Sequence, residues 1–363
     1  MAGCCVTDVT ATALLDPVLD RGVERADVLA VDVLGIGSAL PDRVVTNDDW
    51  AATLDTDDDW IRSRTGIAER RFAADGETTT TLATAAARGA LTDAGVAASD
   101  LTAIIVATTT PDRPMPGTAV EVAAALGTEV AAFDVQAVCA GFVTALRVAG
   151  PLAATGPVLV IGAETMSRII DHGDRGTAVL FGDGAGAVVI GPSGSRTVPH
   201  GAFGRGGSLG PFDLGSDGTQ VGILEIPAGG SRAPASNATV AANEHTIRMH
   251  GPEVYRNAVV RMAESSHAVL DAAGLTADDV DVLVGHQANA RILDGVARRL
   301  SIPAERCQLS VDRHGNTSAA SIPLALADAA DSGLVHPGAR VLLTAFGAGL
   351  SWASCLLTLG DDA

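Results

Sequence analysis

The chain has 363 residues, of which 47% are hydrophobic, so it is long enough for two domains or for one large core in two parts. Its formal net charge of −19 argues against binding to nucleic acid or to an anionic membrane surface. No apolar run reaches the ~18 residues that a membrane-spanning helix needs. The N-terminus also lacks the basic and apolar regions of a secretory signal.

Residues 1–28 come first and are predicted to be a poorly ordered extension ahead of the folded core. The cysteines are odd in number and have no regular spacing, which favours a reducing compartment over a disulfide framework. We therefore predict a cytoplasmic protein. The cysteines are Cys4, Cys5, Cys139, Cys307 and Cys355.

An internal duplication organises the rest of the chain. Residues 91–106 and 270–284 both read as a helix end, a glycine stop, a short acidic loop and a buried strand. Predicted strands at 131–135 and 307–311 then follow at nearly the same spacing. The pattern predicts two α/β halves, residues 29–200 and 201–363, with largely buried sheets.

The duplication places three reactive residue types in comparable positions. It predicts that Cys139 and Asn316 lie at matching helix starts, and that His286 ends a buried strand, where α/β sites collect. Alone, His286 could be an ordinary core histidine and Asn316 a helix N-cap. Their occurrence together in register with Cys139 favours a catalytic interpretation. The segment 204–243, rich in Gly, Ser, Pro and Ala, is predicted to be a loop.

Cys139 stands between an apolar strand-like run and the helical sequence 141–154. The first turn of a helix has unpaired N–H groups and the positive end of the dipole, which favour a thiolate. We therefore predict a nucleophile with a lowered pKa, whose neighbouring amides hold an oxyanion. The alternative is a small buried core cysteine.

Six motifs in a fixed order make this chain resemble the β-ketoacyl-acyl-carrier-protein synthase III branch of the thiolase superfamily, over residues 29–360. The resemblance implies an α/β protein with a thiolase-like five-layer αβαβα fold, and a homodimer. The motifs are residues 59–67, 138–142, 174–186, 286–292, 314–320 and 346–352.

The resemblance implies a decarboxylative Claisen condensation. Cys139 would take an acyl group from acyl-CoA, and the carbanion formed from malonyl-acyl-carrier protein by loss of CO2 would then attack it. The backbone N–H groups of Cys139 and Ala348 would hold the oxyanion, and His286 and Asn316 would stabilise the enolate without a metal. No cofactor is expected, because acyl-CoA is a substrate.

Further residues carry over from the family as substrate contacts. Trp60 and Arg175 would sandwich the CoA adenine, Arg64 would contact a CoA phosphate or hydroxyl, and Asn289 would contact the pantetheine. An acidic carrier protein would need a local basic patch on this acidic chain. The residues assigned to docking are Gln287, Ala288, Asn289, Ala290, Arg291, Arg298 and Arg299. For Arg298 and Arg299, an ordinary solvated helix face is the alternative.

Met115 and Phe181 are assigned to the acyl pocket. Met115 stands where many acetyl-specific members have Phe, and by resemblance its side chain crosses the dimer interface into the partner's pocket. Because Met is flexible, we predict acyl groups longer or more branched than acetyl.

The predicted function is therefore the initiation of fatty-acid or polyketide chains. The alternative is an acyltransferase of specialised metabolism on the same fold that moves an acyl group to a hydroxyl without condensation. A non-catalytic partner subunit is disfavoured by Cys139. Thiolase-type degradation is disfavoured because no second cysteine occupies the turn at 346–349.

Overall fold

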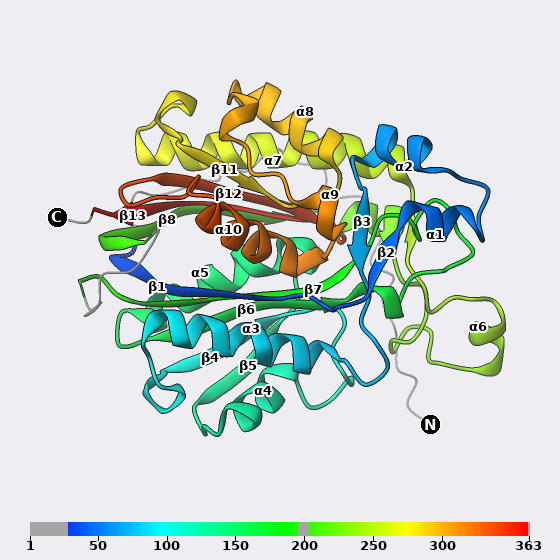
Figure 1. Cartoon of the computed structure of the whole chain (residues 1–363), viewed down its shortest axis with the longest axis horizontal. Coiled ribbons are helices and arrows are strands. Elements are labelled where there is room, and N and C mark those ends of the chain that lie inside the picture. The colour runs from blue at the N-terminus through cyan, green and yellow to red at the C-terminus, as the bar shows by residue number, and fades with distance from the viewer. Residues whose placement is uncertain (1–27, 195–202, 362–363) are drawn as a thin grey trace, which may run out of the picture.

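A computed structural model describes residues 28–194 and 203–361. The predicted extension, residues 1–28, therefore lies outside the described residues except for its last position. Figure 1 shows five layers, with α7 (Gly251–Ala273) and α8 (Ala290–Leu300) above one sheet and α3 (Thr79–Ala94) and α4 (Thr118–Leu126) below the other. Two further helices, α5 (Gly141–Ala153) and α10 (Ser321–Asp331), lie between the sheets. The αβαβα prediction is confirmed.

The five-stranded sheet comes from the first half of the chain and has the order β1-β7-β6-β4-β5. The four-stranded sheet comes from the second half and has the order β11-β12-β13-β8. The strands are β1 (Val31–Ala39), β4 (Ala103–Ala107), β5 (Ala131–Val135), β6 (Val158–Thr165), β7 (Asp183–Pro192), β8 (Gly204–Ser216), β11 (Val282–Gly285), β12 (Arg340–Gly347) and β13 (Ser351–Gly360).

Shorter elements pack at one end of these layers and form the cap that is seen on the right of Figure 1. A small sheet pairs β2 with β3, and another pairs β9 with β10. The elements are β2 (Val44–Thr46), α1 (Asn47–Ala51), α2 (Asp58–Thr65), β3 (Glu69–Arg71), β9 (Leu224–Glu225), α6 (Asn237–Ala241), β10 (Arg248–Met249) and α9 (Val311–His314).

The two halves repeat one topology, as the duplicated sequence predicts. β4 is parallel to β6 and β11 is parallel to β12, and in each half the next two strands in the sheet are antiparallel. The central helices α5 (Gly141–Ala153) and α10 (Ser321–Asp331) begin 180 residues apart, as do the 3-10 turns Val138–Ala140 and Ser318–Ala320 that precede them. The fold is therefore a duplication.

The offset of 180 residues corrects the predicted equivalence of Cys139 with Asn316. The residue equivalent to Cys139 is Ala319, and Asn316 lies in the turn just before the second 3-10 helix. Val138 and Ser318 are also equivalent, and both have a positive φ, 48° and 47°. The repeated backbone brings both helix starts to the middle of the molecule, with Asn316 preceding the second one.

Two predicted local structures were wrong. The predicted strand 307–311 is reduced to a single parallel bridge between Cys307 and Leu283, because the N–H groups of Ser310 and Val311 donate to the side chain of Gln287 instead of to a strand. The predicted loop 204–243 begins with β8, a thirteen-residue strand antiparallel to β13.

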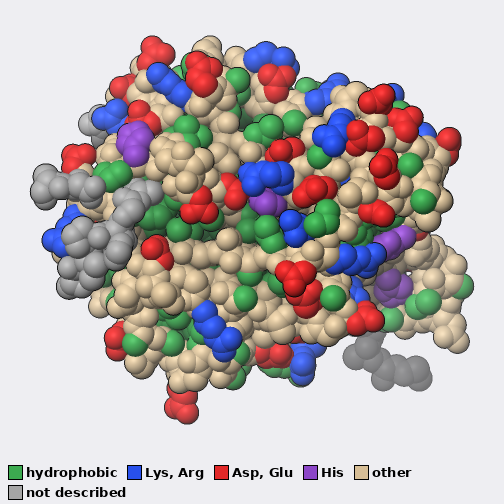
Figure 2. Space-filling view, viewed as in Figure 1, with side chains coloured by type: hydrophobic (Ala, Val, Ile, Leu, Met, Phe, Trp, Pro, Cys, Tyr) green, Lys and Arg blue, Asp and Glu red, His purple; other side chains and the backbone are tan. Residues whose placement is uncertain are grey.

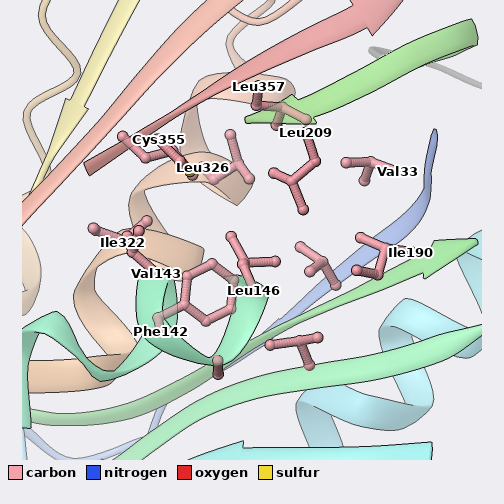
Figure 3. Packing of buried hydrophobic residues seen from close by; sticks show 14 of the residues in the cluster. Val33, Phe142, Val143, Leu146, Ile190, Leu209, Ile322, Leu326, Cys355 and Leu357 are labelled. Carbon is pink, nitrogen blue, oxygen red and sulfur yellow. The ribbon is translucent and has the colours of Figure 1, made fainter. Parts of the chain in front are cut away.

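The main core lies between the two sheets, around α5 and α10. Figure 3 shows Phe142, Val143 and Leu146 of α5 packed among residues of both sheets and of α10, such as Ile190 and Leu209. All five are buried. This packing fixes where α5 begins, and with it the position of the cysteine just before the helix. No helix in the described part of the chain has both the length and the apolar character to cross a bilayer.

Arg70 on β3 is a buried cation under the cap, with no exposed surface. Its guanidinium donates to the carbonyl oxygens of Val45 and Val179 and to the side-chain oxygen of Asn47. Burial lowers the pKa of Arg70 to about 10, so the group remains charged at neutral pH. Arg70 therefore joins three chain segments of the cap.

We expect Arg70→Met to lower the free energy of unfolding by about 3 kcal/mol, because it leaves buried acceptors without a donor. Chemical denaturation measures this change, with the exposed Arg232→Met as the matched control. Equal stability of the two variants would contradict the role given to Arg70.

Candidate active site

A cavity of about 920 Å³ opens between the cap and the central layers. Cys139, His286 and Asn316 all line it, although they are far apart in the sequence. Ala348 lies on the same wall, and the rest of the lining is mainly apolar. The structure thus brings together the three side chains and the backbone group that the sequence singled out.

Cys139 lies in the 3-10 turn Val138–Ala140, after β5 and directly before α5. Gly347 passes so close that a Cβ added there would be 2.8 Å from the backbone nitrogen of Cys139. The Ser351 hydroxyl lies 3.1 Å from both the Ala137 and the Ala348 carbonyl oxygens, and its one proton is shared between these two acceptors. The turn that carries Ala348 is therefore tied to the turn that carries the thiol. This places their backbones side by side, as an oxyanion site requires.

The folded surroundings of Cys139 favour the neutral thiol over the thiolate. Burial raises the pKa of Cys139 to about 12, and the nearby Glu164 carboxylate acts in the same direction. The predicted lowering of this pKa was wrong, because desolvation and a buried negative charge outweigh the helix start. Thiolate formation therefore requires a group that receives the proton.

His286 follows β11 and lines the cavity. Its backbone N–H donates to Thr344 O at 2.8 Å, and its Nδ1 is 2.6 Å from the hydroxyl oxygen of Ser321. Burial lowers the pKa of His286 to about 3, so the imidazole is neutral at physiological pH. With Nδ1 bonded to Ser321, Nε2 is left to act on a ligand.

Asn316 is held by its backbone on both sides. Its N–H donates to Leu180 O at 2.8 Å, and its carbonyl accepts from Gly182 N at 3.0 Å. Its side-chain oxygen accepts from the N–H of Ser318 at 2.9 Å, as a residue that caps a helix does. Because the oxygen is used in this way, the amide NH2 is left to donate into the cavity. Asn316 can therefore act both as a helix cap, through its side-chain oxygen, and as a catalytic donor, through its amide NH2.

Of the three residues assigned to CoA, Trp60 and Arg64 line the cavity, and Arg175 lies against Trp60 without lining it. The guanidinium carbons of Arg64 and Arg175 lie 4.5 Å and 4.6 Å from the centre of the Trp60 ring. Asn289 caps α8 and donates from its side chain to Arg64 O at 3.1 Å. Arg175 stacks directly on Trp60, so an adenine between the two side chains requires Arg175 to move outward.

The residues assigned to carrier docking are not all at the surface. Gln287 is buried, and its side chain bonds to the backbone of Gly285, Gln308, Ser310 and Val311. It is therefore unavailable to a docking partner, and that assignment was wrong.

The other docking residues lie at the start or on the outer face of α8. Ala288, Asn289 and Arg291 line the cavity, and Ala290 packs beneath the cap. Arg298 and Arg299 are exposed, and Arg298 forms an ion pair with Asp294 at 2.7 Å. Of the two acyl-pocket residues, Phe181 is buried in the cavity wall, whereas Met115 is 83% exposed and does not line this cavity.

Sequence reasoning missed three polar side chains behind the cavity. Ser321 orients His286, and Ser318 lies 3.6 Å from the sulfur of Cys139. Glu164 lies behind Ser318 in β6 and is completely buried. The sequence holds one sign of Glu164: it is the one charged residue in the largely apolar strand sequence Val158–Thr165.

Comparison with known proteins decides the family. A protein of Streptomyces coelicolor named β-ketoacyl-[acyl-carrier-protein] synthase III 3 is 50% identical over 338 residues, which covers 92% of this chain and 97% of that protein. The chain belongs to the β-ketoacyl-acyl-carrier-protein synthase III family. The family models described as 3-oxoacyl-[acyl-carrier-protein] synthase III and its C-terminal part match residues 133–218 and 270–359 of this synthase.

Solved structures of similar proteins agree with this assignment. The synthase III of Aquifex aeolicus is 40% identical to this synthase, with a TM-score of 0.81 over 90% of this chain and 99% of that one. The priming β-ketosynthase of the R1128 polyketide pathway is 37% identical, with a TM-score of 0.81 over 92% of this chain and 98% of that one. The present chain is thus a condensing enzyme of the thiolase superfamily.

Proposed function

We propose that this synthase condenses an acyl-CoA starter with malonyl-acyl-carrier protein and thereby starts fatty-acid or polyketide chains. The observation that supports this most is the meeting of Cys139, His286 and Asn316 in one largely apolar cavity. A thiol, two neutral donors and an adjacent backbone turn are the groups that acyl transfer and decarboxylation both need.

The first half-reaction forms the acyl-enzyme. The Cys139 sulfur attacks the thioester carbon of acyl-CoA, the backbone N–H groups of Cys139 and Ala348 hold the oxyanion, and CoA leaves as its thiol. Trp60 and Arg64, which line the cavity, and Arg175 beside Trp60 would hold the adenine end of CoA.

The second half-reaction forms the carbon–carbon bond. Malonyl-acyl-carrier protein loses CO2, and its thioester oxygen becomes an enolate that accepts hydrogen bonds from Nε2 of His286 and the amide of Asn316. The enolate carbon attacks the acyl carbon on Cys139, the bond from that carbon to the Cys139 sulfur breaks with its electrons left on the sulfur, and the β-ketoacyl product leaves on the carrier. These steps call for no cofactor beyond the acyl-CoA substrate.

The proposal includes docking of an acidic carrier protein at the start of α8. Arg291 lines the cavity, and Arg298 and Arg299 are exposed along the same helix. Figure 2 shows acidic and basic side chains interspersed over one face of the molecule, so a small basic group can mark a specific docking point.

We further propose a homodimer through the edge of the five-stranded sheet. In the described chain β5 is hydrogen-bonded on one side only, to β4, and edge strands of this kind add a second chain readily. Phe133 on β5, Val120 on α4 and Met115 nearby are exposed apolar side chains. The described cysteines are free, which supports a place in the cytoplasm.

We expect Met115→Phe to shift the starter preference toward acetyl-CoA, by roughly tenfold relative to a longer or branched acyl-CoA. The reason is that, in the proposed dimer, this side chain closes the partner's pocket, and a rigid ring leaves less room than Met. Competition between two acyl-CoA substrates measures the ratio. Strict acetyl preference in the unaltered enzyme would refute the proposed wide pocket.

The proposed function is tested by incubating the purified enzyme with malonyl-acyl-carrier protein and a panel of acyl-CoA substrates. Intact mass spectrometry of the carrier is expected to reveal a β-ketoacyl group, and the panel identifies the preferred starter. Acyl transfer to a hydroxyl acceptor, with no change on the carrier, would favour the acyltransferase alternative.

A further inference from the structure

Glu164 is a completely buried carboxylate that the reaction described above does not use. It lies in β6, and no Lys, Arg or His forms an ion pair with it in the described part of the chain. An unpaired buried charge is costly, so a carboxylate here needs a compensating set of hydrogen bonds or a role.

The surroundings of Glu164 supply donors. The N–H groups of Thr109 and Thr110 lie about 3 Å from its oxygens, and the hydroxyl of Thr110 donates at 2.6 Å. The hydroxyl of Ser318 donates to Oε1 at 3.0 Å, and the N–H of Ala319 donates more weakly at 3.4 Å. Burial raises the pKa of Glu164, and these hydrogen bonds oppose that shift, because an ionised carboxylate can accept from all of the donors.

Ser318 links this carboxylate to the nucleophile. Its hydroxyl proton is committed to Glu164, so the lone pairs of its oxygen face the thiol of Cys139, 3.6 Å away. Its backbone is held at φ 47° by the N–H bond to Asn316, a conformation that few serines adopt. The thiol proton is therefore directed toward Ser318.

We propose that Glu164, acting through Ser318, takes the proton of the Cys139 thiol during acyl transfer. The S–H proton moves to the Ser318 oxygen, and the hydroxyl proton of Ser318 moves to Oε1 of Glu164. The freed electron pair on sulfur forms the bond to the acyl carbon, and the CoA sulfur leaves with the electrons of the broken bond. The proton then returns from Glu164 along the same path to that sulfur.

The charges of the site favour this path. Burial raises the pKa of both Cys139 and Glu164, and the charge of Glu164 adds to the shift of Cys139. A thiolate and a carboxylate so close together in a buried site disfavour each other. Transfer of the proton keeps a single negative charge, which moves from the carboxylate to the sulfur.

His286 also lines this cavity, and burial lowers its pKa to about 3, so its ring is neutral. Its Nδ1 is bonded to the hydroxyl of Ser321, and its Nε2 is left for the decarboxylation step. Because Glu164 touches no substrate, it is a positioning residue that acts through Ser318.

The test compares Glu164→Gln and Ser318→Ala with the unaltered full-length enzyme. Two rates are followed across pH by mass spectrometry: acylation of Cys139 by acyl-CoA, and its alkylation by iodoacetamide, mapped to the Cys139 peptide. We expect both rates to fall by about 10²-fold at neutral pH in both variants, and to recover as hydroxide forms the thiolate. The matched control is Ser266→Ala, which removes a buried hydroxyl on α7 and is expected to leave both rates unchanged.

Alkylation needs no acyl-CoA, so the two readouts separate this inference from the proposed function on which it rests. Failure of the unaltered enzyme to be acylated would count against the function, whereas alkylation still reports on Glu164. If Glu164→Gln reacts as fast as the unaltered enzyme or faster at neutral pH, Glu164 only holds the thiol neutral and the inference is overturned. If that variant does not fold, an unchanged rate in Ser318→Ala overturns it.

Discussion

Replacing Cys139 with alanine is expected to abolish the acyl-enzyme and to lower the condensation rate by more than about 10³-fold, because no second thiol lines the cavity among the described residues. Other nucleophilic groups on the lining are the hydroxyls of Thr109 and Tyr255 and the carboxylate of Glu225, which are weaker nucleophiles than a thiol. Intact mass spectrometry after mixing with acyl-CoA measures the acyl-enzyme, and release of CoA gives the rate.

The matched control is Cys307→Ala, because Cys307 is a free, partly exposed cysteine outside the cavity. It is expected to acylate and condense at the unaltered rate. The Cys139→Ala variant is also expected to keep slow decarboxylation of malonyl-acyl-carrier protein, since His286 and Asn316 remain. Acylation that persists in Cys139→Ala would show that the nucleophile has been assigned to the wrong residue.

Replacing His286 with alanine, or Asn316 with aspartate, is expected to lower the condensation rate by about 10²–10³-fold while Cys139 is still acylated. Each change removes one donor to the enolate. Asn316→Asp keeps the oxygen that accepts from Ser318 N, so the turn beside the thiol is preserved. Pre-formed acyl-enzyme mixed with malonyl-acyl-carrier protein isolates the affected step, and release of CO2 measures it.

The pH dependence provides a further check on the same step. Because burial lowers the pKa of His286 to about 3, its ring stays neutral in the working range, and the His286→Ala defect is expected to have the same size at pH 6 and pH 8. An equal loss of acylation and decarboxylation in these variants would instead indicate a general disturbance of the cavity.

The order of strands and helices could be predicted from the sequence because the duplicated halves combine buried apolar runs with glycine helix stops. The strand β8 could not, since its composition is that of a loop. It is a strand because β13 supplies its hydrogen bonds, and its glycines permit a close approach: a Cβ on Gly204 would lie 1.8 Å from Gly360 O. The paired residues are 135 to 156 positions apart in the sequence, so the pairing leaves no local signal.

The site residues likewise separate into those that local sequence predicted and those that depend on contacts distant in the sequence. Cys139, His286 and Asn316 were found because each ends or follows a recognisable element within a motif. The neutral state of the thiol was not predicted, because it depends on burial and on Glu164, which reaches Cys139 only through the folded chain. Likewise, the burial of Gln287 depends on its bonds to Ser310 and Val311, more than twenty residues away.

The most direct test of the proposed condensation is a single-turnover experiment. The enzyme is acylated with its preferred acyl-CoA, freed of excess substrate, and mixed with malonyl-acyl-carrier protein, and both proteins are weighed by intact mass spectrometry. We predict that the acyl mass disappears from Cys139 while the carrier loses CO2 and gains that same acyl mass. Loss of the acyl group to water or to another acceptor, with the malonyl carrier unchanged, would contradict the proposed condensation.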